Sequence, residues 1–245
     1  MSEYKDIFTK EVIHLITLVD EKESENIKKA SKLILETFKN KGIVHVFATG
    51  HSHMFAEELF YRAGGLVPID PVLVPELMQH VGAITSTKLE RKSGKAKEIF
   101  DSLDLKEKEA FIIVSNSGIN AVPVEMAELA KEHGHPVIVI TSVNASKKLE
   151  SRVSSNKHLY DFGDVVIDNH IPYGDYFVDT KSGRTGSASS IIGSYIAQRL
   201  VLEVIKLSEE EGITPPIFQS ANISGGDSHN EKLVKEYQER IKPLC

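Results

Sequence analysis

The chain has 245 residues, 41% of them hydrophobic, and carries a formal net charge of −6. That length and apolar content are sufficient for one hydrophobic core, so we expect a single domain over residues 1–245. The acidic balance argues against a general nucleic-acid binder, because phosphate backbones are held mainly by surplus Lys and Arg. The only cysteine, Cys245, leaves no internal disulfide and no cysteine zinc cage, which fits a reducing cytoplasm.

The sequence predicts neither an export signal nor a membrane partner. Charges occupy the N-terminal segment where a signal peptide needs an apolar run. The most apolar long stretch, 187–205, contains Gln198, Arg199 and Glu203. Placing this amide and these two charges in hydrocarbon costs far more than placing them on one face of a water-exposed helix.

The first structural unit is predicted from a change of hydrophobic period. Apolar residues recur at helical spacing over 7–19 and again over 27–38, so two helices are expected before Gly42. Residues 43–48 form a short β-branched run that is typical of a buried strand. The loop 49–53 then leads into a helix that is expected to end near Gly64.

The same pattern returns further along the chain. Strands are predicted at 110–114, 137–141 and 164–168, with a weaker one at 66–69, and a helix at 124–134. Alternating strands and helices imply parallel pairing, and hence a three-layer α/β sandwich with helices on both faces of the sheet. Ligands in such folds bind at the carboxyl ends of the strands.

Several segments interrupt this alternation. Residues 71–93 show little periodicity, and 170–186 is a long loop rich in Gly, Asp and Tyr. Long loops in a compact domain are usually functional or cover something. After a helix at 187–207 comes a tail, 212–245, with a polar helix at about 228–241 that we expect to dock on the domain or on a partner chain.

Small polar residues fill both strand-to-helix loops. Free N–H groups at a helix start bind anions without a lysine. Neither loop has the Gly and Lys spacing of the common nucleotide motifs, so a phosphate monoester fits better than a dinucleotide. One such loop alone is an ordinary helix cap, but two after buried parallel strands favour binding. The candidate ligand residues in them are Gly50, Ser52, Ser115, Asn116, Ser117, Gly118 and Asn120.

The sequence around these loops resembles the sugar isomerase (SIS) domain family. The segments F-A-T-G-H-S and F-I-I-V-S-N-S-G-I-N carry the resemblance, which extends over about 25–210. It implies a five-stranded parallel sheet in a flavodoxin-like sandwich, a homodimer and a phosphosugar ligand. It also matches Ser52, Ser115, Ser117 and Asn120 to phosphate-contacting positions, although many members have Thr where this chain has Asn120. Helix 3–20 and the tail 212–245 are additions to this core.

The segment A-E-E-L at 56–59 is similar to a stretch of phosphoheptose isomerase and would make Glu58 the catalytic base. Glu58 lies about one helical turn closer to its loop than the catalytic glutamate does in phosphoheptose isomerase. The helix predicted at 187–207 also lacks that enzyme's partner histidine. Histidines that could supply the acid, or bind a metal with Glu58, are His51, His53 and His80. Because lone histidines are more often surface or capping residues, we expect neither metal nor cofactor.

A third loop, 181–186, precedes the helix that begins at Ser187. Lys181 and Arg184 could close over a sugar phosphate, while Ser187 and Ser189 offer another contact at a helix start. A solvated loop capped by Ser187 explains the same residues equally well.

These observations predict a phosphosugar-binding homodimer, with aldose–ketose isomerisation as the leading reaction. A lyase or deaminating isomerase acting on an amino-sugar phosphate is a second enzymatic hypothesis. A sensor without catalysis is the third, but the roughly forty residues before the first strand are too few and too acidic for a DNA-binding module.

Overall fold

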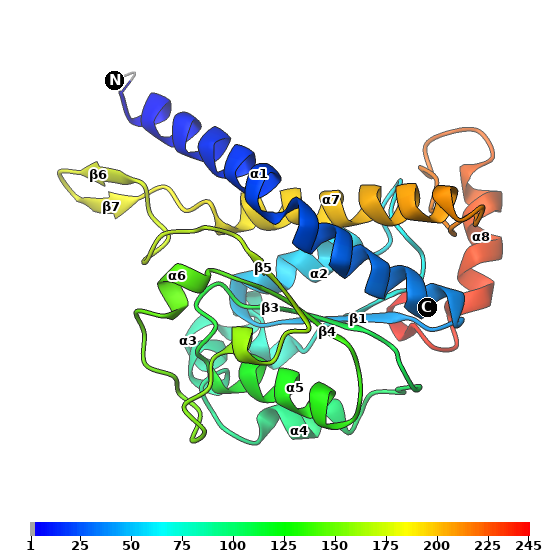
Figure 1. Ribbon diagram of the computed structural model, residues 1–245, viewed down its shortest axis with the longest axis horizontal. Helices are drawn as coiled ribbons and strands as arrows, with labels where there is room; N and C mark the ends of the chain where they lie inside the picture. The colour runs from blue at the N-terminus through cyan, green and yellow to red at the C-terminus, as the bar shows by residue number, and fades with distance from the viewer. Residues whose placement is uncertain (1–2) are drawn as a thin grey trace.

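A computed structural model describes residues 3–245 and shows a parallel sheet between two helical layers (Figure 1). The five strands lie in the order β2-β1-β3-β4-β5, all parallel. This confirms the predicted three-layer α/β sandwich. The strands are β1 (Val44–Ala48), β2 (Ile69–Val72), β3 (Phe111–Val114), β4 (Val137–Thr141) and β5 (Val165–Asp168).

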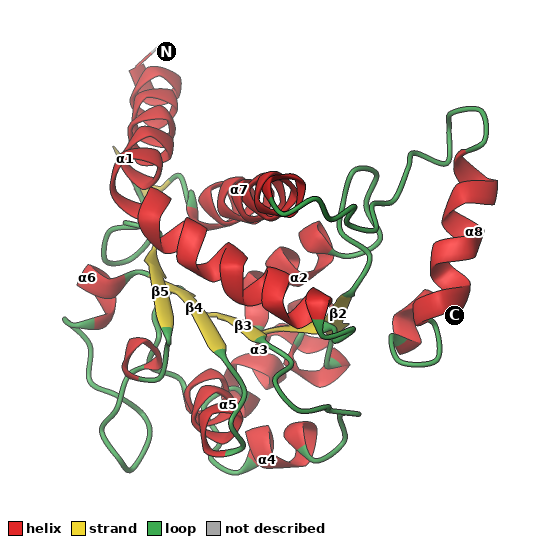
Figure 2. Cartoon of the chain, turned by 45° about the vertical axis from the view of Figure 1, so that its right-hand side comes forward, coloured by secondary structure: helices red, strands yellow, loops and turns green. Residues whose placement is uncertain are grey.

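Helices cover both faces of the sheet, and the central strands β1, β3 and β4 are therefore buried on both sides. Their sequences are mostly apolar, as such burial requires. One face packs against α1 (Glu3–Lys39), α2 (Met54–Leu59) and α7 (Ser189–Glu210). The other packs mainly against α4 (Lys95–Phe100) and α5 (Ala121–Glu132). The remaining helices are α3 (Gln79–Leu89), α6 (Val143–Ser146) and α8 (Gly226–Tyr237). Figure 2 shows α8 beyond β2, at the edge of the sheet.

The prediction of two helices before the first strand was wrong. Residues 3–39 form one helix of 37 residues. The polar stretch between the two apolar runs holds good helix formers and neither Gly nor Pro, so nothing in it stops the helix. Its Glu23 is buried and contacts His170 after β5.

The strand predicted at 66–69 lies further along the chain. The strand in the structure is β2, Ile69–Val72, whereas Leu66 forms only an isolated bridge with Ile217 of the C-terminal segment. Pro71 is tolerated because β2 is an edge strand. The predicted helix after the first loop also ends early, at Leu59.

The two irregular segments contain more structure than the sequence pattern indicated. Residues 71–93 hold α3, whose apolar side chains Val81 and Ile84 are exposed, so burial gives this helix no periodic pattern. The loop 170–186 contains a hairpin of β6 (Val178–Thr180) and β7 (Gly183–Thr185). Figure 1 shows it projecting beside the N-terminal end of α1. No helix among residues 3–245 is long and apolar enough to cross a membrane.

Candidate functional site

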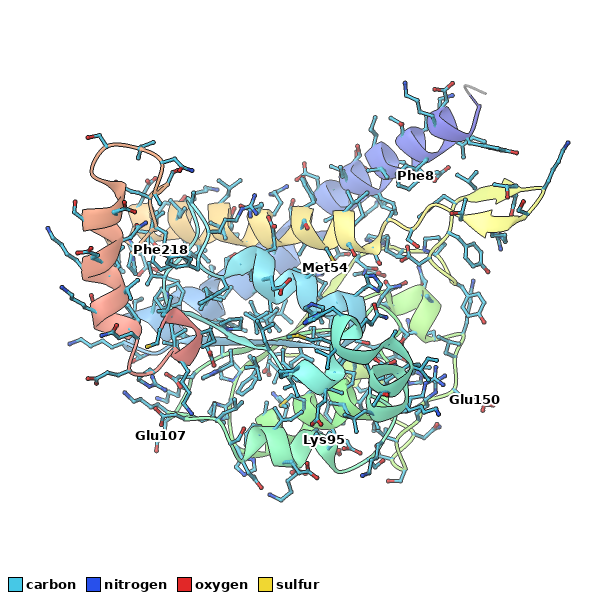
Figure 3. All side chains as sticks on the ribbon, turned by 180° about the vertical axis from the view of Figure 1, so that it is seen from behind. Phe8, Met54, Lys95, Glu107, Glu150 and Phe218 are labelled. Atoms are coloured by element: carbon cyan, nitrogen blue, oxygen red, sulfur yellow. The ribbon has the colours of Figure 1, made fainter. Side chains whose placement is uncertain are left out.

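A pocket lies at the carboxyl ends of the strands, where the fold places ligands. Its cavity volume is about 30 Å³, and the rest of the hollow is open to solvent. Residues of α2 and α7 form two walls of this pocket. Figure 3 shows Met54 at the start of α2, beneath α7. The lining residues are His51, Ser52, Met54, Phe55, Val114, Asn116, Ile140, Asn169, Ser189, Ser190, Gly193 and Ser194.

The loop after β3 forms the polar floor of this region. Asn116 is fixed in place, because its Oδ1 accepts a bond from Asn169 Nδ2 at 3.0 Å and its carbonyl accepts the Ser142 N–H. Ser115 Oγ is buried and accepts the Gly118 N–H at 3.2 Å. In the chain from residue 3 onward, the backbone N–H groups of Ser117, Ile119 and Asn120 have no acceptor. The loop therefore offers unused donors to an anion.

Asn120, predicted as a phosphate contact, is held by protein side chains. Its Nδ2 donates to Glu90 Oε1 at 2.8 Å, and its Oδ1 accepts from Arg152. Glu90 Oε2 in turn accepts the Thr49 hydroxyl at 2.9 Å. Burial raises the pKa of the Glu90 carboxyl, and the Thr49 hydrogen bond only partly opposes this.

The start of α7, predicted as a third anion contact, already binds a carboxylate of the protein. Asp175 Oδ1 accepts the N–H groups of Ala188 and Ser189, and Oδ2 accepts the Ser189 hydroxyl at 2.6 Å. The exposed Ser187 donates to the Asp175 carbonyl. Asp175 thus satisfies the donors that Ser187 and Ser189 were predicted to offer to a ligand.

Replacing Asp175 by Ala should lower the free energy of unfolding by about 1 kcal/mol, as for other lost helix caps. Asn keeps one acceptor oxygen, so Asp175→Asn should lose less. Urea denaturation measures both variants, with Asp179→Ala in the exposed hairpin as the control. Equal stability of Asp175→Ala and wild type would refute the capping role.

The predicted catalytic groups do not converge. Glu58 is outside the pocket lining, and its carboxylate accepts from Arg62 and from Gln198 Nε2, both at 2.8 Å. His80 is exposed at the start of α3, with its ring centroid 6.1 Å from that of His53. Of the predicted catalytic residues Glu58, His51 and His80, only His51 lines the pocket. Within residues 3–245, no group of three or more His, Cys, Asp or Glu side chains is arranged to hold a metal ion.

The cations of the third loop lie in the hairpin. Arg184 pairs with Asp179 at 2.7 Å, and its guanidinium lies 3.9 Å from the ring centre of Tyr176. Lys181 is exposed in the turn between β6 and β7. Neither lines the pocket.

A polar contact between the buried Glu23 and the half-buried His170 lies next to the pocket. His170 follows the lining residue Asn169, and its Nε2 lies 3.1 Å from Glu23 Oε1 on α1. The hydrogen bond to Glu23 raises the pKa of His170 above its usual value. This contact links the long first helix to the end of β5.

Sequence reasoning missed several residues of this region. Asn169 could have been found, because it is the first residue after a predicted strand. Glu90 and Asp175 lie in segments without clear periodicity, and only tertiary contacts bring them to the loops. Ser190, Gly193 and Ser194 belong to one face of α7, which was predicted as a helix without an assigned pocket face.

Comparison with known proteins identifies the family. The SIS domain pattern matches residues 7–142, more than half of the chain. The chain belongs to the SIS domain family. A UPF0309 protein of Geobacillus kaustophilus is 44% identical over 231 residues, which are 94% of this chain and 92% of that protein.

Two solved structures share the SIS fold. A phosphoheptose isomerase from Francisella tularensis aligns with a TM-score of 0.55 at 15% identity, covering 81% of this chain and 95% of that one. The NanR protein of Vibrio vulnificus, in complex with ManNAc-6P, aligns with a TM-score of 0.50 at 13% identity, covering 100% of this chain and 71% of that one.

Proposed function

We propose that this SIS domain protein binds a phosphorylated sugar at the carboxyl ends of its strands. The observation that carries the proposal is the set of unused N–H groups at Ser117, Ile119 and Asn120, beside a pocket rich in hydroxyl and amide side chains. Backbone donors of this kind hold a phosphate ester. The hydroxyls and amides of the pocket suit the hydroxyls of a sugar.

Similar proteins support this ligand class. One structural relative is a phosphoheptose isomerase, and another is complexed with ManNAc-6P. We retain the homodimer as part of the proposal, to be measured by analytical ultracentrifugation.

The geometry favours binding without catalysis over isomerisation. An isomerase, like the alternative amino-sugar phosphate lyase or deaminase, needs a proton acceptor beside the sugar. His51 is the single titratable side chain among the described residues that line the pocket. The Glu58 carboxylate is held by Arg62 and Gln198. A sensor requires no such group.

Calorimetry and thermal melts with hexose 6-phosphates, N-acetylhexosamine 6-phosphates and heptose 7-phosphates test the proposal. Unphosphorylated sugars and inorganic phosphate serve as comparisons. We expect at least one sugar phosphate to bind and raise the melting temperature. NMR of the same mixtures detects ketose, ammonia or lactate formation. Any of these products would show that the protein is an enzyme and not a sensor. Indifference to the whole panel would refute the proposed function.

Ser52→Ala and Ser117→Ala should each weaken the affinity for the bound sugar phosphate about five- to tenfold, the loss of roughly one hydrogen bond. Stability should change little, because neither side chain is buried. Calorimetry of both variants is compared with Ser154→Ala, an exposed serine on the loop after α6. Wild-type affinity in both variants would show that these two hydroxyls do not contact the ligand.

A further inference from the structure

Glu90 joins the two loops that carry the proposed ligand donors. It directly follows α3 and makes three hydrogen bonds, two of them to these loops and one to the helix after the second loop. Its carboxylate accepts the Thr49 hydroxyl at 2.9 Å and the Asn120 amide at 2.8 Å. Its carbonyl accepts the Val122 N–H at 3.0 Å, in the first turn of α5. A single residue therefore holds the end of β1 and the start of α5 together.

This bridge changes what Asn120 does. An asparagine that precedes a helix usually accepts an N–H from the first turn. Asn120 makes no such bond, because its amide nitrogen donates to Glu90 and its oxygen accepts from Arg152. The side chain is committed to the protein, while its own backbone N–H remains free.

Charge balance does not explain the carboxylate. Burial raises the pKa of Glu90, so this position disfavours the charged form relative to a glutamate in water. Arg91 and Arg152 act on Glu90 through space and lower its pKa, but they do not outweigh burial. What the carboxylate supplies here is two acceptor oxygens at a fixed distance, directed at two loops.

We infer that Glu90 is a positioning residue of the ligand site, which sets the separation of the two loops by tying Thr49 to Asn120. An ideal Cβ added at Gly50 would lie 3.9 Å from Glu90 Oε2, so the carboxylate lies against the first loop as well as bonding to it. The inference rests on the proposed function for its ligand, while the bridge itself is a property of the free protein.

Four variants separate the bridge from the charge. Glu90→Ala removes both side-chain bonds. Glu90→Gln keeps both, because its oxygen can accept from Asn120 while its NH₂ donates to the Thr49 hydroxyl. Thr49→Val removes one bond without changing the shape of the side chain, and Thr49→Ser keeps it. Glu98→Ala, an exposed glutamate of α4 paired with Lys95, is the control for loss of a glutamate.

Hydrogen exchange of the free protein and calorimetry with inorganic phosphate are the two measurements. In Glu90→Ala, amides of both loops, 49–53 and 115–121, should exchange about tenfold faster, and phosphate affinity should fall about tenfold. Glu90→Gln, Thr49→Ser and Glu98→Ala should stay within about threefold of wild type. Thr49→Val should lose affinity and accelerate exchange, and it supplies the test if Glu90→Ala does not fold.

Two results would overturn the inference. Thr49→Val with wild-type exchange and affinity would show that the bridge does not position the loops. Glu90→Gln as impaired as Glu90→Ala would show that charge, not bridging, matters. If wild-type protein binds neither phosphate nor any sugar phosphate, the proposed function fails, and the exchange data alone decide whether Glu90 couples the loops.

Discussion

Glu109→Gln is expected to lower the free energy of unfolding by about 3–5 kcal/mol, the usual loss when one partner of a buried ion pair is removed. The Glu109 side chain is 1% exposed. Its carboxylate lies 3.2 Å from His45 Nε2 and 2.6 Å from an Arg240 nitrogen. His45 is buried inside β1 and also contacts Asp70 at 2.9 Å. Arg240 belongs to the C-terminal segment, so the substitution should also loosen that segment.

A glutamine cannot replace these contacts. The Glu109 carboxylate also accepts the backbone N–H groups of Ile43 and Lys106, and an amide has only one acceptor oxygen. Urea denaturation gives the comparison, with Glu107→Gln as the matched control because Glu107 is exposed; Figure 3 shows it at the surface. A loss below about 1 kcal/mol would mean that the network adds little to stability.

The loss should depend on pH with a definite sign. Burial opposes protonation of His45, but Asp70 and Glu109 outweigh it and raise its pKa, so its contribution is complete below about 6.5 and is lost as the pH rises through the native pKa. Burial likewise disfavours ionised Glu109, but His45 and Arg240 outweigh it and lower its pKa. Its contribution is complete above about 4.5 and is lost as the pH falls. The difference between wild type and Glu109→Gln should therefore be largest between about pH 4.5 and 6.5.

Gly118→Ala is expected to destabilise the protein by about 2–4 kcal/mol and to abolish sugar-phosphate binding, because strain and overpacking add at this position. The backbone there has φ +63°, which a side chain disfavours. A Cβ would meet Thr141 Oγ1 at 2.7 Å and Ser146 Oγ at 2.9 Å, and both residues are fully buried. The loop could accept the methyl group only by shifting its free N–H groups.

Gly134→Ala separates strain from crowding. Gly134 also has a positive φ, +79°, but nothing lies within 4 Å of the added Cβ, so only about 1–2 kcal/mol should be lost. Adding Ser146→Ala to Gly118→Ala removes one of the two clashing oxygens and should restore part of the stability. Denaturation and calorimetry measure all three variants. Equal effects of the alanines at 118 and 134 would refute the role of crowding.

The central architecture could be predicted because its signals are local. Buried parallel strands need continuous apolar runs, and those at 110–114, 137–141 and 164–168 were found within one residue of β3, β4 and β5. The edge strand β2 was misplaced, because Pro68 and Pro71 interrupt its pattern. The helix α3 was missed, because it exposes Val81 and Ile84.

The candidate site divides in the same way. His51, Ser52, Asn116 and Ser189 were predicted as site residues from their places at strand ends or a helix start, and the fold brings them to one pocket. Asn169, which follows β5, and Phe55 of α2 also line this pocket. Whether any of them contacts a sugar phosphate is what the binding experiments measure.

The sequence by itself determined the four strands β1, β3, β4 and β5, the small polar loops after β1 and β3, and the parallel pairing that gathers those loops at one edge. Only the tertiary structure decided which donors in the loops stay free. Glu90 accepts a hydrogen bond from the side chain of Asn120, and Asp175 accepts the donors at the start of α7. Hydrogen bonds between residues so far apart in sequence follow from how the elements pack, and no local pattern encodes that packing.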